Sequence, residues 1–324
     1  NLSLSWKSMV YFNATGRNDV VSTMPRDNRS FFYPSASLSF VASELDALKD
    51  MSWLSFAKVR ASYAEVGQAG SYYENYYVTP SYGGGFWVGT PFQYPYGGIS
   101  SYQPNSTMYD PNLKPQNTQS YEFGVDLKFL DNRLGIDYTY SKQNVTDQIF
   151  PVPLAGSTGA DQLIMNGGSV TTDVHEVMLY ITPVKTKDYQ WDLTMNYSKV
   201  QNMVNELAPG VESIFLGGFV TPQVRAGIGN TYPVIYGTSF VRDDNDNIVV
   251  VDNPGAWNHG MPQAGDPAVI GEVSPDFILN GTTAFTYKSI SLSAVFEWKQ
   301  GGQMYSGSNG LIDLYGVSAV TEDR

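Results

Sequence analysis

Apolar and polar residues alternate along much of the chain. Between residues 120 and 129 every second residue is apolar, and the positions between them hold charged residues or glycine. The alternation resumes over residues 134–140, after a polar link in which Asp131 and Asn132 tolerate left-handed backbone angles. A period of two is the side-chain repeat of a β-strand. The two segments therefore predict an antiparallel hairpin.

The same alternation recurs in seven further segments: 10–14, 34–42, 57–63, 177–181, 191–197, 279–287 and 290–298. The last two are joined only by Lys288 and Ser289, which predicts a second tight hairpin. No segment keeps a helical period over more than about two turns. The sequence thus predicts an all-β protein with about nine strands.

The connections between these segments fall into two kinds. Links near residues 131, 187 and 289 are short, and residues 44–52 form a compact one. They alternate with long connections near residues 17–30, 67–118, 144–171, 205–274 and 304–324. Compact globular domains rarely contain loops longer than about 12–15 residues. Short turns at one end and long loops at the other are typical of an antiparallel transmembrane β-barrel of the outer membrane, whose long loops are extracellular.

The two faces of the predicted strands differ in a way that fits such a barrel. One face is apolar and has aromatic residues near the strand ends: Phe129, Tyr140, Tyr287 and Trp298. Aromatic residues at strand ends suit the interfacial girdles of a membrane barrel. The other face carries charges of both signs: Lys58, Arg60, Glu122, Asp126, Asp137, Glu297 and Lys299. That face predicts a water-filled lumen.

The composition argues against several kinds of partner and functional site. Only 15% of the 324 residues are charged, against about 25% in soluble domains, and the net charge of -12 argues against nucleic acid as a partner. The sequence contains no run of about 18 apolar residues, so it predicts no membrane-spanning helix. With no cysteine and only His175 and His259, the chain offers no readable nucleophile–base set or metal-ligand set. We therefore predict no enzymatic activity, no cofactor and no metal centre.

An acidic stretch at residues 243–247 resembles the front of a calcium loop. The EF-hand pattern requires glycine at its sixth position and glutamate at its twelfth. Counted from Asp243, those positions hold Ile248 and Pro254. The stretch is better interpreted as the acidic tip of a hairpin.

The connection at residues 67–118 is rich in glycine and aromatic residues. Its rings could pack on one another to hold an ordered surface loop, or could offer flat faces and hydroxyls to a sugar or an extended peptide. Both interpretations can hold together. The candidate substrate-binding residues are Tyr73, Tyr76, Tyr77, Trp87, Tyr94 and Tyr96.

Residues 15–19, 30–40 and 54–67, taken in order, resemble the barrel of SusC/RagA-type TonB-dependent outer-membrane transporters. Residues 15–19 and 30–40 are similar to the family's "R-x-D … FPS-x-S-x-x-W" pattern, and residues 54–67 to "LKLRASYG-x-x-G". Shorter similarities follow at 110–116, 121–126, 132–134, 138–142, 275–277 and 300–303. Phe40 in place of the usual Trp, the Ala64-Glu65 pair, and residues 171–176 depart from the family pattern.

The resemblance implies one part of a 22-stranded barrel in the outer membrane of a Gram-negative bacterium. The first residues contain no signal peptide, so we expect a piece of a longer protein, without plug, signal peptide or terminal strands. The family imports glycans or oligopeptides, with a SusD-like surface lipoprotein over the mouth and energy from the TonB complex acting on the plug. The strand faces also imply contact with outer-membrane lipids.

Two other functions stay open at this point. One is a passive porin or structural barrel without TonB coupling. The other is a secreted all-β adhesin or glycan-binding protein, which would be soluble without detergent.

Overall fold

The computed structural model describes residues 1–73, 77–78, 81–82, 92–218 and 221–322. Its main element is a ten-stranded antiparallel sheet in which each strand pairs with the next long strand along the chain. In spatial order the strands are β1 (Leu2–Trp6), β2 (Val10–Val20), β3 (Ser30–Val41), β4 (Leu54–Gln68), β10 (Gln116–Phe129), β11 (Leu134–Thr146), β14 (Ser169–Lys185), β15 (Tyr189–Glu206), β20 (Pro275–Tyr287) and β21 (Ile290–Gly301).

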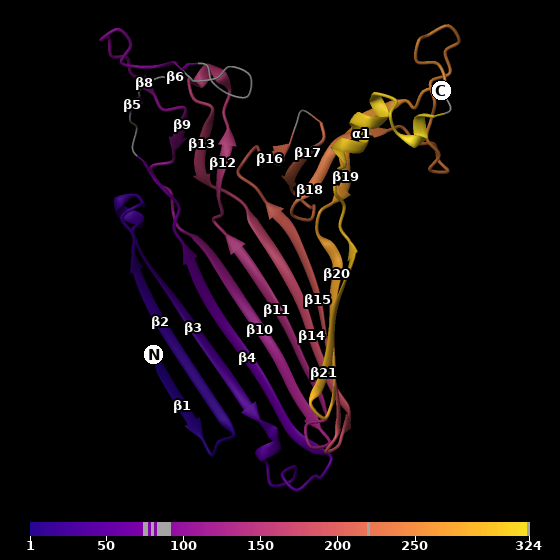
Figure 1. The fold of residues 1–324 in the computed structure, drawn as a ribbon. Coiled ribbons are helices and arrows are strands. Elements are labelled where there is room, and N and C mark those ends of the chain that lie inside the picture. The colour runs from indigo at the N-terminus through magenta and orange to yellow at the C-terminus, as the bar shows by residue number, and fades with distance from the viewer. Residues whose placement is uncertain (74–76, 79–80, 83–91, 219–220, 323–324) are drawn as a thin grey trace.

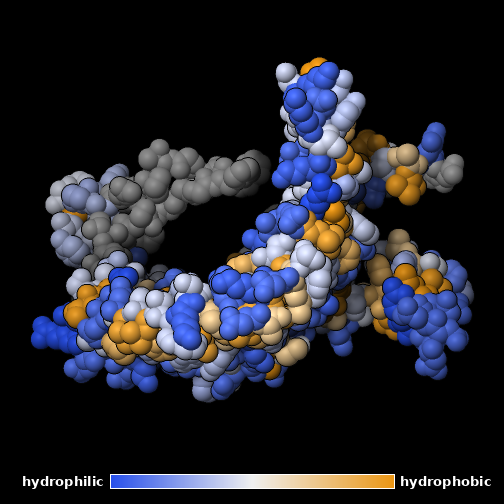
Figure 2. All heavy atoms as spheres, turned by 90° about the horizontal axis from the view of Figure 1, so that it is seen from below, coloured by the Kyte–Doolittle hydropathy of each residue, from blue (hydrophilic) through white to orange (hydrophobic). Residues whose placement is uncertain are grey.

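This sheet is the wall of a barrel segment, and β1 and β21 are its two edges. The strands lean in one direction, with the short turns at one end and the long connections at the other (Figure 1). Viewed from below, the strands form a curved wall that is concave on one side (Figure 2). The all-β barrel architecture predicted from the alternation is confirmed. The wall has one strand more than the nine expected, because the short strand β1 also pairs with β2.

The tight turns follow from local backbone chemistry. Leu130, Asp131 and Asn132 all take left-handed angles between β10 and β11, with φ of 53°, 55° and 62°. Lys288, with φ of 51°, makes the two-residue turn between β20 and β21. Both hairpins therefore form where the sequence predicted them, and the ladder pairs Phe129 with Leu134.

The long connections contain further short elements. In the first, β2 and β3 stay paired up to Val20 and Ser30, so the strands continue into the expected loop at 17–30. The others contain β5 (Tyr77–Val78), β6 (Ser81–Tyr82), β7 (Phe92–Gln93), β8 (Gln103–Pro104), β9 (Thr107–Tyr109), β12 (Ile149–Pro153), β13 (Gln162–Asn166), β16 (Ser213–Gly218), β17 (Gln223–Gly227), β18 (Val234–Phe240), β19 (Ala264–Glu272) and α1 (Gly307–Leu314). No helix in these described segments is long and apolar enough to cross a membrane.

Strands β16 to β19 form a four-stranded sheet above the wall, which we call the rim sheet. A small core lies where this sheet meets the wall and β12, and is made by Phe150, Val170, Val204, Leu207, Ile214 and Ala226. Val170 and Val204 are paired residues at the upper ends of β14 and β15. Burial of these side chains fixes the rim sheet to the wall, since apolar area removed from water stabilises packing at about 25 cal/mol per Å².

One face of the wall is apolar from edge to edge. A single row of the ladder runs through Val59, Val125, Tyr138 and Val177, and the next row down is also apolar. Aromatic pairs mark the lower limit of this outward face. Trp53 stacks on Phe129 with ring centroids 6.0 Å apart, and Tyr189 stacks on Tyr287 at 4.7 Å.

Aromatic residues also mark the upper limit of the outward face, and this limit descends across the sheet. Tyr63 and Tyr121 face each other across β4 and β10, with centroids 5.0 Å apart. Tyr140, on β11, lies one same-face step lower, since it pairs with Phe123. Tyr197 and Trp298, on β15 and β21, lie one further step down, because their ladder row leads back to Val125. This stepwise descent is expected where a flat membrane surface crosses strands that are tilted from the membrane normal.

Candidate functional site

The opposite face of the wall is polar and carries the charges that the sequence assigned to the lumen. Alternation and register place Lys58, Asp126 and Asp137 in one row across β4, β10 and β11. The next row up contains Arg60, Gly124 and Thr139. Charges of both signs in adjacent rows can be sustained in a wet lumen, where water solvates them. This inward face is the surface that a solute passing through the lumen would meet.

Arg60 is the centre of an ion-pair network on the inward face. Its guanidinium donates two hydrogen bonds to the Asp137 carboxylate, from Nη2 to Oδ1 at 2.9 Å and from Nη1 to Oδ2 at 3.1 Å. Its Nε lies 3.5 Å from Oε1 of Glu122. Both the Arg60 and Asp137 side chains are 26% exposed. Paired bonds of this kind fix the guanidinium in one orientation.

The absence of a side chain at Gly124 makes this network possible. Arg60 and Asp137 lie on β4 and β11, with β10 between them, so the arginine must cross β10. It crosses at Gly124, where a Cβ atom would lie only 2.5 Å from its Nε. The glycine thus permits a close approach that any larger residue would obstruct.

The predicted aromatic candidates are only partly described. Tyr76 and Trp87 lie outside the described residues, and Tyr77 lies in β5. The ring of Tyr73 meets Tyr109 edge-on at 5.4 Å, yet Tyr73 remains 54% exposed. Tyr72 contacts Tyr109 from another side at 6.2 Å. The structure therefore brings Tyr73 to a ring, Tyr109, that sequence reasoning did not single out.

The remaining two candidates lie together. Tyr94 and Tyr96 flank Pro95, and Tyr96 forms a small bridge with Ile99 through two backbone hydrogen bonds of 3.0 Å. Tyr96 is 60% exposed and Tyr94 is half-buried. Their part in substrate binding stays a prediction.

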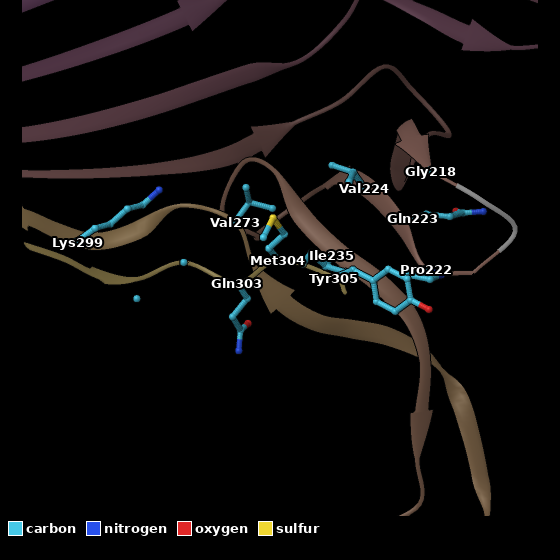
Figure 3. A pocket seen from close by; sticks show the side chains of 12 residues that line it. Gly218, Pro222, Gln223, Val224, Ile235, Val273, Lys299, Gln303, Met304 and Tyr305 are labelled. Atoms are coloured by element: carbon cyan, nitrogen blue, oxygen red, sulfur yellow. The ribbon is translucent and has the colours of Figure 1, made fainter. Parts of the chain in front are cut away.

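An apolar cavity of about 590 Å³ lies where the rim sheet meets the end of β21. Figure 3 shows side chains from β17, β18 and the segment after β21 around it. Apolar cavities of this size can hold a ring or a short aliphatic group. The lining residues are Gly218, Pro222, Gln223, Val224, Ile235, Val273, Lys299, Gly301, Gly302, Gln303, Met304 and Tyr305.

The acidic stretch forms a hairpin tip beyond the rim sheet, as the sequence favoured. Arg242 and Ile248 pair across it. The Asp243 carboxylate accepts hydrogen bonds from the backbone N–H groups of Asn245 and Asn247, both at 2.9 Å, and from Nδ2 of Asn247 at 3.1 Å. Bonds to its charged form, those from Asn247 above all, hold the pKa of Asp243 below its usual value. No cluster of three or more metal-ligating side chains occurs among the described residues.

The fold and its two faces define a class of protein, the membrane-spanning β-barrel. The profile of the family "TonB dependent receptor-like, beta-barrel" matches residues 1–307, and the chain belongs to this family. Barrels of this family lie in the outer membrane of Gram-negative bacteria, and the wall described above is part of one.

Curated relatives agree with this assignment. The chain is 24% identical to TonB-dependent receptor P3 of Formosa agariphila, over 94% of the chain and 31% of that protein. It is 26% identical to TonB-dependent receptor SusC of Bacteroides thetaiotaomicron, over 90% of the chain and 30% of that protein. The chain therefore spans about a third of the length of these relatives.

A solved structure shows the same fold. The RagAB peptide importer in its closed-closed state superposes with a TM-score of 0.74 and 18% sequence identity, over 93% of this chain and 32% of that chain. The family resemblance noted in the sequence, including SusC and RagA, is confirmed.

Proposed function

We propose that the protein containing this chain imports a nutrient, a glycan or an oligopeptide, across the outer membrane with energy from TonB. The chain supplies part of the barrel wall and part of the extracellular mouth. It acts by binding and passage of the solute, without chemical change to it.

One observation carries this proposal: the wall is apolar along its outward face and charged along its inward face. The inward charges are fixed in position, as the Arg60–Asp137 pair shows. Such a lumen wall suits the passage of a polar solute or the seating of a plug, and a purely structural barrel has no need of it. Membership of the TonB-dependent receptor family adds the energy source.

A SusD-like surface lipoprotein is the partner we propose at the extracellular mouth. The similarity to SusC and the fold shared with the RagAB peptide importer support it. The rim sheet and the described parts of the connection 67–118, such as β8 and β9, lie at the end of the wall where such a partner would sit (Figure 1).

The proposal can be tested by uptake in cells that carry or lack the full-length gene. We expect deletion to abolish growth on a restricted set of oligosaccharides or oligopeptides that exceed the size limit of porins. Uptake should also stop when TonB is deleted or the proton-motive force is collapsed. Uptake that continues without TonB would instead support a passive porin.

A further inference from the structure

The rim sheet carries an arginine that forms no ion pair with the residues that the structure describes. Arg225, on β17, is half-buried, and within the described part of the chain no carboxylate lies within 4.0 Å of its guanidinium. Its Nε donates to Oε1 of Gln223 at 2.7 Å, and its Nη1 donates to Oγ of Ser213 at 2.8 Å. Both acceptors are neutral, so they orient the guanidinium without cancelling its charge.

An aromatic ring holds the same group from another side. The guanidinium carbon of Arg225 lies 4.8 Å from the ring centre of Tyr236, on the neighbouring strand β18. Stacking on a ring and side-chain hydrogen bonds leave little freedom to an arginine. Arg225 is therefore pre-organised, and its Nη2 makes no hydrogen bond to the described residues.

Arg225 and Tyr236 line a cavity of about 400 Å³. Alternation along β17 places Arg225 and Ala226 on opposite faces of the rim sheet. Ala226 packs into the core with Val170 and Val204, which alternation places on the inward face of β14 and β15. The Arg225 face is thus turned away from the wall, toward the space above the lumen. A solute entering the barrel would reach this cavity from outside.

We propose that this cavity binds a carboxylate of the imported solute through Arg225. The inference rests on the function proposed above and specifies the chemistry of its substrate. A planar carboxylate matches the fork of a guanidinium and supplies the negative charge that the Arg225 guanidinium does not find among the described residues. A uronic acid in a glycan and an acidic side chain in a peptide offer this same group.

One residue of the cavity opposes such a ligand and sharpens the test. Glu212 lines the cavity and is exposed, but it forms no ion pair with Arg225 in the described structure. Its charge repels an incoming carboxylate. Removing the charge of Arg225 and removing the charge of Glu212 should therefore change affinity in opposite directions.

The experiment measures binding by the purified full-length receptor to two pairs of probes. One pair is trigalacturonate and its carboxyl-reduced, neutral form; the other is a short Glu-containing peptide and the same peptide with Gln. We expect the wild-type receptor to bind the charged member of at least one pair about tenfold or more tightly than its neutral match, and that pair identifies the source of the carboxylate.

The variants decide whether Arg225 is responsible. Arg225→Gln should remove the preference and Arg225→Lys should reduce it, while Glu212→Gln should increase it. Arg133→Gln, at the opposite end of the wall, should leave it unchanged. If Arg225→Gln does not fold, the lysine and Glu212 variants still give the answer.

The proposal would be overturned if the wild-type receptor showed no preference for either charged probe. It would also be overturned if the preference survived Arg225→Gln or decreased in Glu212→Gln. Neither result touches the TonB dependence of uptake, which is measured separately. Failure of the carboxylate site and failure of the transport function are thereby distinguishable.

Discussion

Val125 gives the sharpest test of which face of the wall meets lipid. It lies in the middle of β10, four residues from Tyr121 at the upper limit of the outward face and four from Phe129 at the lower. Four residues rise about 13 Å along a strand, or about 10–11 Å of depth at a tilt of about 30–40°. Val125 is therefore close to the midplane of the bilayer, where Val125→Arg places a charge in hydrocarbon.

The expected cost follows from that depth. An arginine on the lipid face costs about 2–4 kcal/mol at the midplane and about 0–1 kcal/mol near the interfaces. Val125→Arg should therefore shift the folding equilibrium by about 30- to 700-fold, because each 1.4 kcal/mol is a factor of about ten. Tyr121→Arg, at the rim of the same strand, should cost little.

The assay is the fraction of full-length receptor that reaches the outer membrane in a folded, heat-modifiable form. Ser62→Arg is the matched control, since it places the same side chain on the inward face, opposite Glu122. Asp126→Asn tests the inward neighbour of Val125 directly. We expect a large loss for Val125→Arg and small losses for the other two.

Equal losses for Val125→Arg and Ser62→Arg would refute the assignment of faces. A larger loss for Tyr121→Arg than for Val125→Arg would keep the faces but contradict the placement of the membrane.

Three further predictions concern the inward network and the hairpin tip. Arg60→Met should destabilise the folded receptor by about 1–2 kcal/mol, a cost between those of exposed and buried ion pairs. In a double-mutant cycle with Asp137→Asn, the coupling energy between the two residues should account for most of this loss. Gly124→Ala should displace Arg60 and lower the free energy of unfolding, measured by chemical denaturation, by about 1 kcal/mol. In an Arg60→Ala background the same substitution should cost little. An equal cost in that background would mean that Gly124 does not serve the Arg60 network. Because the folded pKa of Asp243 is lowered, its contribution is complete above its ordinary value near 3.8 and is lost as pH falls through the lower, folded value. Asp243→Asn should increase hydrogen exchange at Asn247 at neutral pH, whereas Asp244→Asn should not.

Much of the wall could be predicted from the sequence because alternation is a local property. It assigns Val125 and Asp126 to opposite faces without knowledge of the partner strands, and the turn residues join β10 to β11 correctly. Register between strands separated by a long connection is not local. The contact of Arg60 with Asp137 depends on the pairing of β4 with β10 across the connection 67–118, so no period in the sequence reveals it.

The rim sheet was not predicted for a different reason. Its strands are short and interrupted by bulges, as between β18 and β19, so alternation never extends far enough to be distinguished from a loop. Arg225 and Tyr236 are eleven positions apart in the connection 205–274, and only the pairing of β17 with β18 brings them together. The loop tyrosines were selected by composition alone, which does not indicate that Tyr73 would pack on Tyr109.

The descending row of aromatic residues lets the tilt be worked out. From the Tyr63–Tyr121 pair to the row of Tyr197 and Trp298, the upper limit drops four residues, which is about 13.6 Å along the strands. The same step crosses about 4.5 strand spacings, which is about 21.6 Å across the sheet. The ratio of these two lengths gives a strand tilt of about 32°. A slip of two residues between strands would leave every side chain on its own face, so the alternation of faces cannot prevent it. It would, however, move Asp173 down into the aromatic row beside Tyr140. Tight turns fix the register of hairpins such as β10–β11. Between strands joined by a long connection, such as β11 and β14, the thickness and level of the bilayer favour one register, as a close-packed interior does in a soluble sheet.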